Sequence, residues 1–303
     1  MSSLLRAEAA KWTEARQGLQ PPLVVAKRLV PIPFIMCTLL NAVSGSSPPW
    51  DFPLASRTAL MAMAFGLFFP ASLLFNLDGA LDDRAWAWLG ALQKHKRCTS
   101  EPERPGALVL HPMNTYSSHA QTAAGLFILA RACGDARARI ASGAFGLTLI
   151  AMGIASHVWW ASRRDAAQRI DSWLMETVTA AMGISMLSLA LPAWEVWLVC
   201  AWAIAAAWRA SSFAAGKAMH ANLLAPTLVY TSGYVFAVLR LGGCGHIWRY
   251  AAGTGWIYAG LVLKMFDTSR IGEWGTAAFH YAAGLGFALL WLWSQTLPAP
   301  SEP

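Results

Sequence analysis

Charged residues are scarce in this sequence. Only 13% of its 303 residues are Asp, Glu, Lys or Arg, whereas a soluble domain carries about 25%. At the same time 56% of the residues are hydrophobic, and they gather in long apolar runs between short charged stretches. This composition argues against a soluble domain and predicts an integral, multi-pass membrane protein.

Paired cysteines are also missing. The five cysteines are scattered along the chain with no Cys-x-x-Cys spacing, so they indicate neither a disulfide framework nor a zinc framework. Sustained strand-like alternation of apolar and polar residues is lacking as well. Because a membrane barrel needs such alternation, we expect an all-α protein. The stretch 1–18 lacks the continuous apolar core of a secretory signal, and we expect it to form a polar helix.

Positive charge is present in excess, with a formal net charge of +7. The Lys and Arg residues fall between the apolar runs, for example at 94–97 (KHKR) and 163–169 (RRDAAQR). That placement fits control of membrane topology and contact with anionic headgroups rather than nucleic-acid binding. The chain also has 16 Trp, whose rings favour lipid and the headgroup interface. The expected partners are therefore membrane lipids, and no nucleic acid.

Apolar runs long enough to cross about 30 Å of hydrocarbon divide the chain into two parts. Two early runs are followed by the polar stretch 77–106, the best candidate for a boundary. We predict an N-terminal extension at 1–106 with one or two hydrophobic helices, a seven-transmembrane-helix core at 107–296 and a tail at 297–303. The early runs are 29–46 and 58–76, and those of the core are about 108–131, 140–161, 172–191, 194–210, 219–240, 246–266 and 275–296.

Several polar side chains fall within the predicted core helices. Ser156 and His157 lie in the second helix, Asp171 at the start of the third, and His280 in the seventh. An Asp at the centre of a membrane helix costs about 2.5–3.5 kcal/mol on insertion scales, so such groups need a partner or a function. Structural roles stay open, because Asp171 is placed like a helix N-cap and Ser156 could bond to its own helix backbone.

Four stretches follow one another along 107–296 at the expected helix ends. They are HPMNTYSSHAQTAAGLF (111–127), GIASHVWWASRRDAAQRID (153–171), KMFDT (264–268) and TAAFHYAAGLGFALLW (276–291). Their joint order resembles the alkaline ceramidase family. That family belongs to the CREST superfamily of seven-helix membrane hydrolases, which includes the adiponectin-type receptors.

The resemblance implies a particular chemistry. In the family three histidines, one on the second helix and two one turn apart on the seventh, hold a zinc ion whose water attacks a lipid amide. A Ser and an Asp hydrogen-bond the water or the developing oxyanion. Carried over residue by residue, the catalytic positions are Ser156, Asp171 and His280, and Ser156 and Asp171 keep the family's fifteen-residue spacing.

The chain departs from the family at two of the three zinc positions. Trp160 stands where the second-helix histidine would be, and Thr276 stands at the first of the two seventh-helix positions. Indole cannot ligate zinc and a hydroxyl is a poor substitute for imidazole, so we expect the zinc to have been lost. His111 replaces an acidic residue that helps to bind calcium in some members, and Ser118 replaces an Asn. A calcium site is therefore not expected.

A rebuilt zinc site remains an alternative. His157 lies about 60° of helix rotation from Trp160, and a rotation of that helix would bring it towards His280. On this alternative His157 and His280 are the metal ligands, and His119 or His220 would supply the third.

Three functions remain open. We favour a catalytically degenerate relative that acts as a structural, lipid-binding or accessory subunit alongside other membrane-protein subunits. The second function is an active zinc-dependent hydrolase of ceramide-like lipid amides, and the third is a haem- or chlorophyll-binding subunit with His157, His220 or His280 as axial ligand. For each we expect a membrane of the endoplasmic reticulum or Golgi, or an organellar inner membrane.

Overall fold

The described part of the chain is helical. The computed structural model describes residues 81–92, 101, 103–132, 136–188, 201, 247–266 and 274–296, and within these stretches no strand is formed. The all-α prediction is confirmed for these residues. The predicted segments 29–46, 58–76, 194–210 and 219–240, together with His220 and the tail 297–303, lie outside the described residues.

The first predicted core segment, about 108–131, is broken into two helices. Helix α5 spans Pro112–Ser117 and α6 spans His119–Arg131, with Ser118 in the turn between them. A proline suits the first turn of a helix because its missing N–H would have no intrahelical partner there. The carboxylate of Glu101 accepts the next two backbone N–H groups, from Met113 at 2.5 Å and Asn114 at 2.9 Å. These contacts fix where α5 begins.

Helices α7 (Ala136–Ser162) and α8 (Asp165–Ser188) form a hairpin with a very short turn. Arg163 makes the turn with a left-handed φ of 52°. Starting the third helix at 172 was wrong: α8 begins at Asp165, whose negative charge suits a helix N-terminus. Asp171 therefore lies in the second turn of α8 and is not its N-cap, because the polar stretch 165–171 is itself helical.

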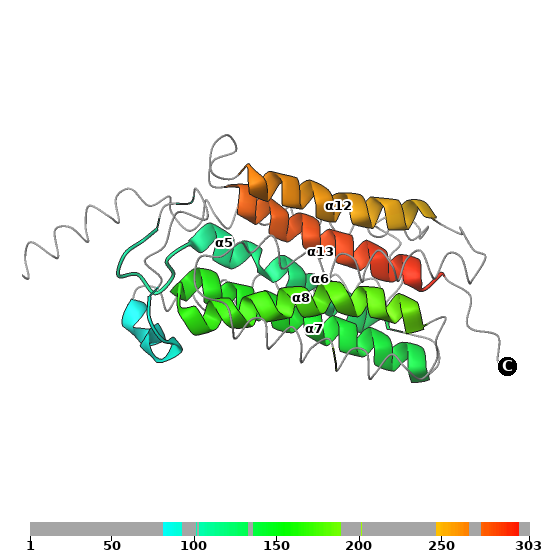
Figure 1. Cartoon of the computed structure of the whole chain (residues 1–303), viewed down its shortest axis with the longest axis horizontal. Helices are drawn as coiled ribbons and strands as arrows, with labels where there is room; N and C mark the ends of the chain where they lie inside the picture. Colours follow the sequence, from blue (N-terminus) through cyan, green and yellow to red (C-terminus); the bar gives the residue numbers. More distant parts are fainter. Residues whose placement is uncertain are drawn as a thin grey trace, which may run out of the picture.

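The bundle is completed by α12 (Ile247–Met265) and α13 (Gly275–Ser294), close to the predicted segments. Helix α6 contacts both α7 and α13, whereas α8 packs on α7 and α12 packs on α13. Figure 1 shows the helices lying lengthwise beside one another in an elongated bundle. Two described helical segments, Ser142–Ser162 and Gly275–Ser294, are long and apolar enough to cross a membrane.

Glycine residues allow α13 to approach both of its neighbours closely. A Cβ placed on Gly284 would lie 2.7 Å from the carbonyl oxygen of Ala120 in α6. On the other side, a Cβ on Gly286 would lie 2.7 Å from the carbonyl oxygen of Gly253 in α12. Small residues at helix crossings are typical of membrane bundles, where helix association depends on close packing. These glycines therefore set the spacing of α6, α12 and α13.

We expect Gly284→Ala to destabilise the bundle by about 1–3 kcal/mol, because the added methyl group meets fixed backbone of α6. The free energy of unfolding of the purified protein, followed by tryptophan fluorescence in detergent, would measure the loss. Gly143→Ala in α7 is the matched control, since its Cβ would meet nothing within 4 Å. Equal stability of the two variants would contradict the close approach of α13 to α6.

Residues 81–92 pack at one end of the bundle, where Figure 1 shows them in cyan. They form the 3-10 helix η2 (Asp83–Leu89). The indole Nε1 of Trp86 donates a hydrogen bond of 2.7 Å to the carbonyl of Leu108. Leu89 is buried against Trp159 and Trp160 of α7. Part of the predicted N-terminal extension is thus packed on the predicted core.

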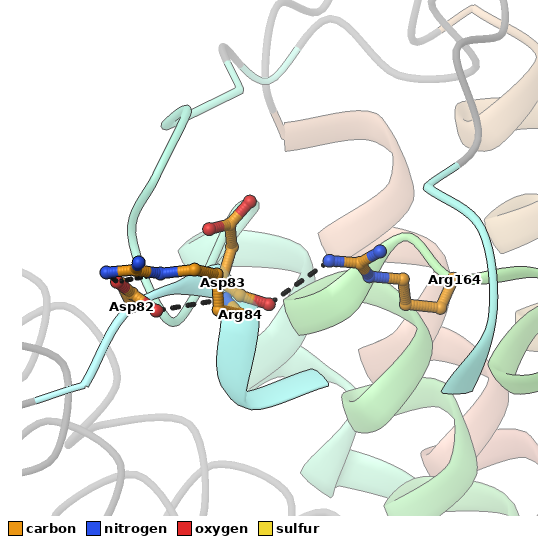
Figure 2. A network of polar contacts seen from close by, with 4 residues as sticks. All are labelled: Asp82, Asp83, Arg84 and Arg164. Carbon is orange, nitrogen blue, oxygen red and sulfur yellow. Dashed lines mark hydrogen bonds and ion pairs between the residues drawn. The ribbon is translucent and has the colours of Figure 1, made fainter. Parts of the chain in front are cut away.

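Arg164, in the turn between α7 and α8, fastens this segment. Its guanidinium donates to the carbonyl oxygens of Asp83 at 3.2 Å and Gly90 at 3.1 Å, and Figure 2 shows it reaching across to Asp83. On the exposed side of η2, Asp82 pairs with Arg84 (Figure 2). The side-chain hydrogen bond from Arg84 lowers the pKa of Asp82 below its usual value.

Arg164→Ala removes two hydrogen bonds to the backbone of residues 83–91. We expect it to loosen this stretch and to leave the helices of the bundle intact. We expect amide hydrogen exchange in this stretch to accelerate about 5- to 30-fold, as for a loss of one to two kcal/mol. Hydrogen-exchange mass spectrometry measures it, with the exposed Arg169→Ala as control. Unchanged exchange in the Arg164 variant would show that other contacts hold the segment.

Candidate functional site

Three consecutive residues at the break between α5 and α6 make polar contacts with other helices in the bundle interior. Ser117, Ser118 and His119 are all at least 98% buried. Successive residues of a helix point about 100° apart, so the three side chains reach different neighbours. Ser117 contacts α13, whereas Ser118 and His119 contact two different positions of α7.

The Ser117 hydroxyl binds His280 of α13. Its Oγ lies 2.7 Å from His280 Nδ1 and 3.1 Å from the carbonyl oxygen of Asn114. The imidazole is 2% exposed. His280 thus has a neutral hydroxyl partner at one ring nitrogen, which ties α13 to the start of the first core helix.

The structure brings Ser156 and Asp171 together. The Ser156 hydroxyl donates a hydrogen bond to the Asp171 carboxylate, and Lys264 of α12 acts on that carboxylate as a positive charge. Ser118 Oγ lies 3.2 Å from Ser156 Oγ, which links the pair to the α5–α6 break. Asp171 Oδ1 has no hydrogen-bond partner. A carboxylate so placed can accept a further hydrogen bond from a water molecule.

His157 belongs to a different contact. Its Nδ1 lies 2.7 Å from Nε2 of His119, and the two ring centroids are 4.7 Å apart. Nδ1 of His119 lies 3.3 Å from the Thr122 hydroxyl. The alternative of a rebuilt zinc site needs His157, His280 and a third histidine around one ion. In the structure His157 contacts His119, whereas His280 contacts Ser117.

Trp160, which the resemblance aligns with a zinc histidine, lies beside His280. The ring centroids of Trp160 and His280 are 6.3 Å apart, and His111 meets the indole edge-on at 5.8 Å. The guanidinium of Arg163 stacks over Trp159 at 4.2 Å and over Trp160 at 5.4 Å. The indole is thus enclosed by rings and a stacked cation, which stabilises it in place.

At the three aligned positions the residues do not supply a zinc donor set. A catalytic zinc needs three protein donors, and of the three aligned positions only His280 carries one. Thr276 is fully buried one turn earlier on α13. Among the residues that the structure describes, no three His, Cys, Asp or Glu side chains are grouped so that they could hold a metal ion.

Some important residues could not be singled out from sequence. Glu101 sits in a polar stretch with no periodic pattern, so its role in capping α5 had no signal. Ser117 and His119 were visible as polar residues near a helix start, but their partners lie 163 and 38 residues away. Only the packing of α6 between α7 and α13 pairs them.

Comparison with known proteins adds no relative. No protein-family model matches the chain, and neither a curated protein nor a solved structure matches it. The alkaline ceramidase resemblance accordingly rests on the order of the quoted motifs.

The Ser117–His280 contact should be measurable as a coupling energy. We expect Ser117→Ala and His280→Phe, combined in a double-mutant cycle, to couple by about 0.6–1.7 kcal/mol, the range for buried polar contacts in membrane proteins. The free energy of unfolding of the four proteins in detergent gives the value. The control cycle combines Thr148→Ala with His280→Phe, because the Thr148 hydroxyl bonds within its own helix and should not couple to His280. If the losses of unfolding free energy are additive in both cycles, Ser117 and His280 are not in contact.

Proposed function

We propose that the chain is an integral, multi-pass membrane protein with an alkaline-ceramidase-like seven-helix core, and that it acts without zinc catalysis. It would serve as a structural, lipid-binding or accessory subunit of a membrane assembly. The observation that carries the proposal is Trp160, a buried indole beside His280 at the position of a zinc-binding imidazole. A ring that cannot ligate zinc occupies the space that the metal site would need.

A membrane location is supported by what the helices bury and expose. The two apolar segments of α7 and α13 are long enough to span a bilayer. Large apolar side chains on α7 and α12 remain exposed, among them Leu147, Ile154, Trp256, Val262 and Met265. Lipid chains or the apolar surface of another subunit would cover such side chains.

A structural use of the polar residues is supported by their contacts with one another. His280 bonds to Ser117, and His157 bonds to His119. Ser156 joins Asp171 to Ser118. A buried polar group that is satisfied by a neighbour stabilises the arrangement that brings the two together. The residues that would perform catalysis in the family here connect α5 and α6 with α7, α8 and α13.

The active hydrolase is the second candidate, and one observation favours it. Ser156 and Asp171 are in contact at the spacing of the family, and one carboxylate oxygen of Asp171 is without a hydrogen-bond partner. An acid and a hydroxyl in this state would suit a bound water molecule. A donor set that supplies two further zinc ligands would be needed, and metal analysis separates the two candidates.

The wild-type protein, purified in the presence of zinc, should contain far less than one zinc per chain. The double variant Trp160→His, Thr276→His should bind one, because it restores imidazoles beside His280 and one turn before it on α13. Elemental analysis by plasma mass spectrometry measures both. Trp159→His with Thr276→His is the matched control, since residue 159 is rotated about 100° from residue 160.

One zinc per wild-type chain would overturn the non-catalytic proposal in favour of the hydrolase. A double variant that folds and still binds no more zinc than the control would instead show that the family alignment is wrong. Folding of each variant is checked by its melting temperature in detergent.

A further inference from the structure

A cavity of about 80 Å³ lies between the helices of the bundle, and its lining includes neither Trp160 nor the residues of the α5–α6 break. Its walls come from α6, α7, α8, α12 and α13 and are mainly apolar, with Met152, Met175, Phe279 and Phe287 among them. One water-sized group needs roughly 10–15 Å³, so the space holds several such groups. Flexible methionine side chains let the wall adapt to the shape of what it holds.

The least buried part of the described lining lies on α8 and α12. The lining residues of α6, α7 and α13 are buried, whereas Met175 of α8 and Ile257 and Leu261 of α12 are only partly buried, and Tyr258 is exposed. Among the described residues, the cavity is therefore least covered on its α8 and α12 side.

Gln121 places an unpaired amide in this wall. The residue lines the cavity, is 1% exposed, and its Oε1 has no hydrogen-bond partner. By contrast, the hydroxyl of Thr179, another lining residue, donates to the carbonyl of Met175 at 3.0 Å. A buried amide without a hydrogen bond is unfavourable by several kcal/mol in an apolar medium, and such groups in native proteins call for a partner.

We propose that this cavity binds the end of an apolar molecule that carries a hydroxyl group, and that the hydroxyl pairs with the Gln121 amide. The inference rests on the lipid-binding part of the proposed function and specifies the chemistry that is bound. It uses none of the residues of the altered zinc position.

A hydroxyl is the group that suits this wall. The unpaired group is the Gln121 amide oxygen, which accepts a hydrogen bond, and a hydroxyl supplies the proton to donate. Among the residues that the structure describes, the lining contains no Lys, Arg, Asp or Glu. Beside these residues a charged headgroup would lose its hydration without gaining a counter-charge, whereas the hydroxyl at the end of an aliphatic chain would satisfy the Gln121 oxygen.

Photolabelling of the full-length protein in lipid nanodiscs tests the proposal. The probes are a short n-alkanol that carries a diazirine and the methyl ether of the same alcohol, which can accept but not donate. We expect the alcohol to label peptides of α6, α12 and α13 about fivefold more than the ether, the factor for one neutral hydrogen bond. Gln121→Leu should lower labelling by the alcohol to the level of the ether.

Two further variants keep the test decisive. Ala283→Met fills the cavity from α13 and should abolish labelling by both probes, and Gln295→Leu at the exposed end of α13 is the matched control that should change nothing. Equal labelling by alcohol and ether in the wild type, or labelling that Gln121→Leu leaves intact, would overturn the proposal. Zinc in the wild-type protein would contradict the proposed function without altering this labelling, so the two can fail separately.

Discussion

The break in the first core helix at Ser118 is the constraint on which the arrangement of this bundle depends. It places three neighbouring polar side chains inside an apolar interior, where each must find a partner. Ser117 finds His280 on α13, and Ser118 and His119 find Ser156 and His157 on α7. An uninterrupted apolar helix could slide or rotate against its neighbours with little change in packing, but this one cannot. These contacts hold α7 and α13 in register with the first core helix. Helix α8 is connected to it through the contact between Ser156 and Asp171.

The same contacts bear on chemistry. The residues to which the ceramidase resemblance assigns metal and water binding contact other neighbours here. His280 contacts Ser117, and Ser156 lies between Ser118 and Asp171. The indole of Trp160 packs among His111, His280 and the guanidinium of Arg163. These contacts stabilise the arrangement of the helices.

Close packing and open space occur along the same stretch of α13. Where Gly284 faces α6 and Gly286 faces α12, backbone approaches backbone without room for one methyl group. Phe279, Ala283 and Phe287 of the same stretch line a cavity together with residues of α6, α7, α8 and α12. Gln121 places an oxygen without a hydrogen-bond partner in that lining.

Local patterns along the chain were enough to predict helices and the approximate positions of α7, α12 and α13, because apolar length is a local property. The contact between Ser156 and Asp171 was not predicted, since the family resemblance implies only that both residues bind a water molecule or the oxyanion. The start of α8 was predicted at 172, but the helix begins at Asp165. The polar residues 165–171 are helical as well, and Asp171 contacts Ser156 of α7. The division of the first helix at Ser118, the pairing of His157 with His119 and of His280 with Ser117, and the unpaired amide of Gln121 were decided by tertiary structure. Each depends on which helices become neighbours, and contacts between residues 38 to 163 positions apart leave no local signal in the sequence.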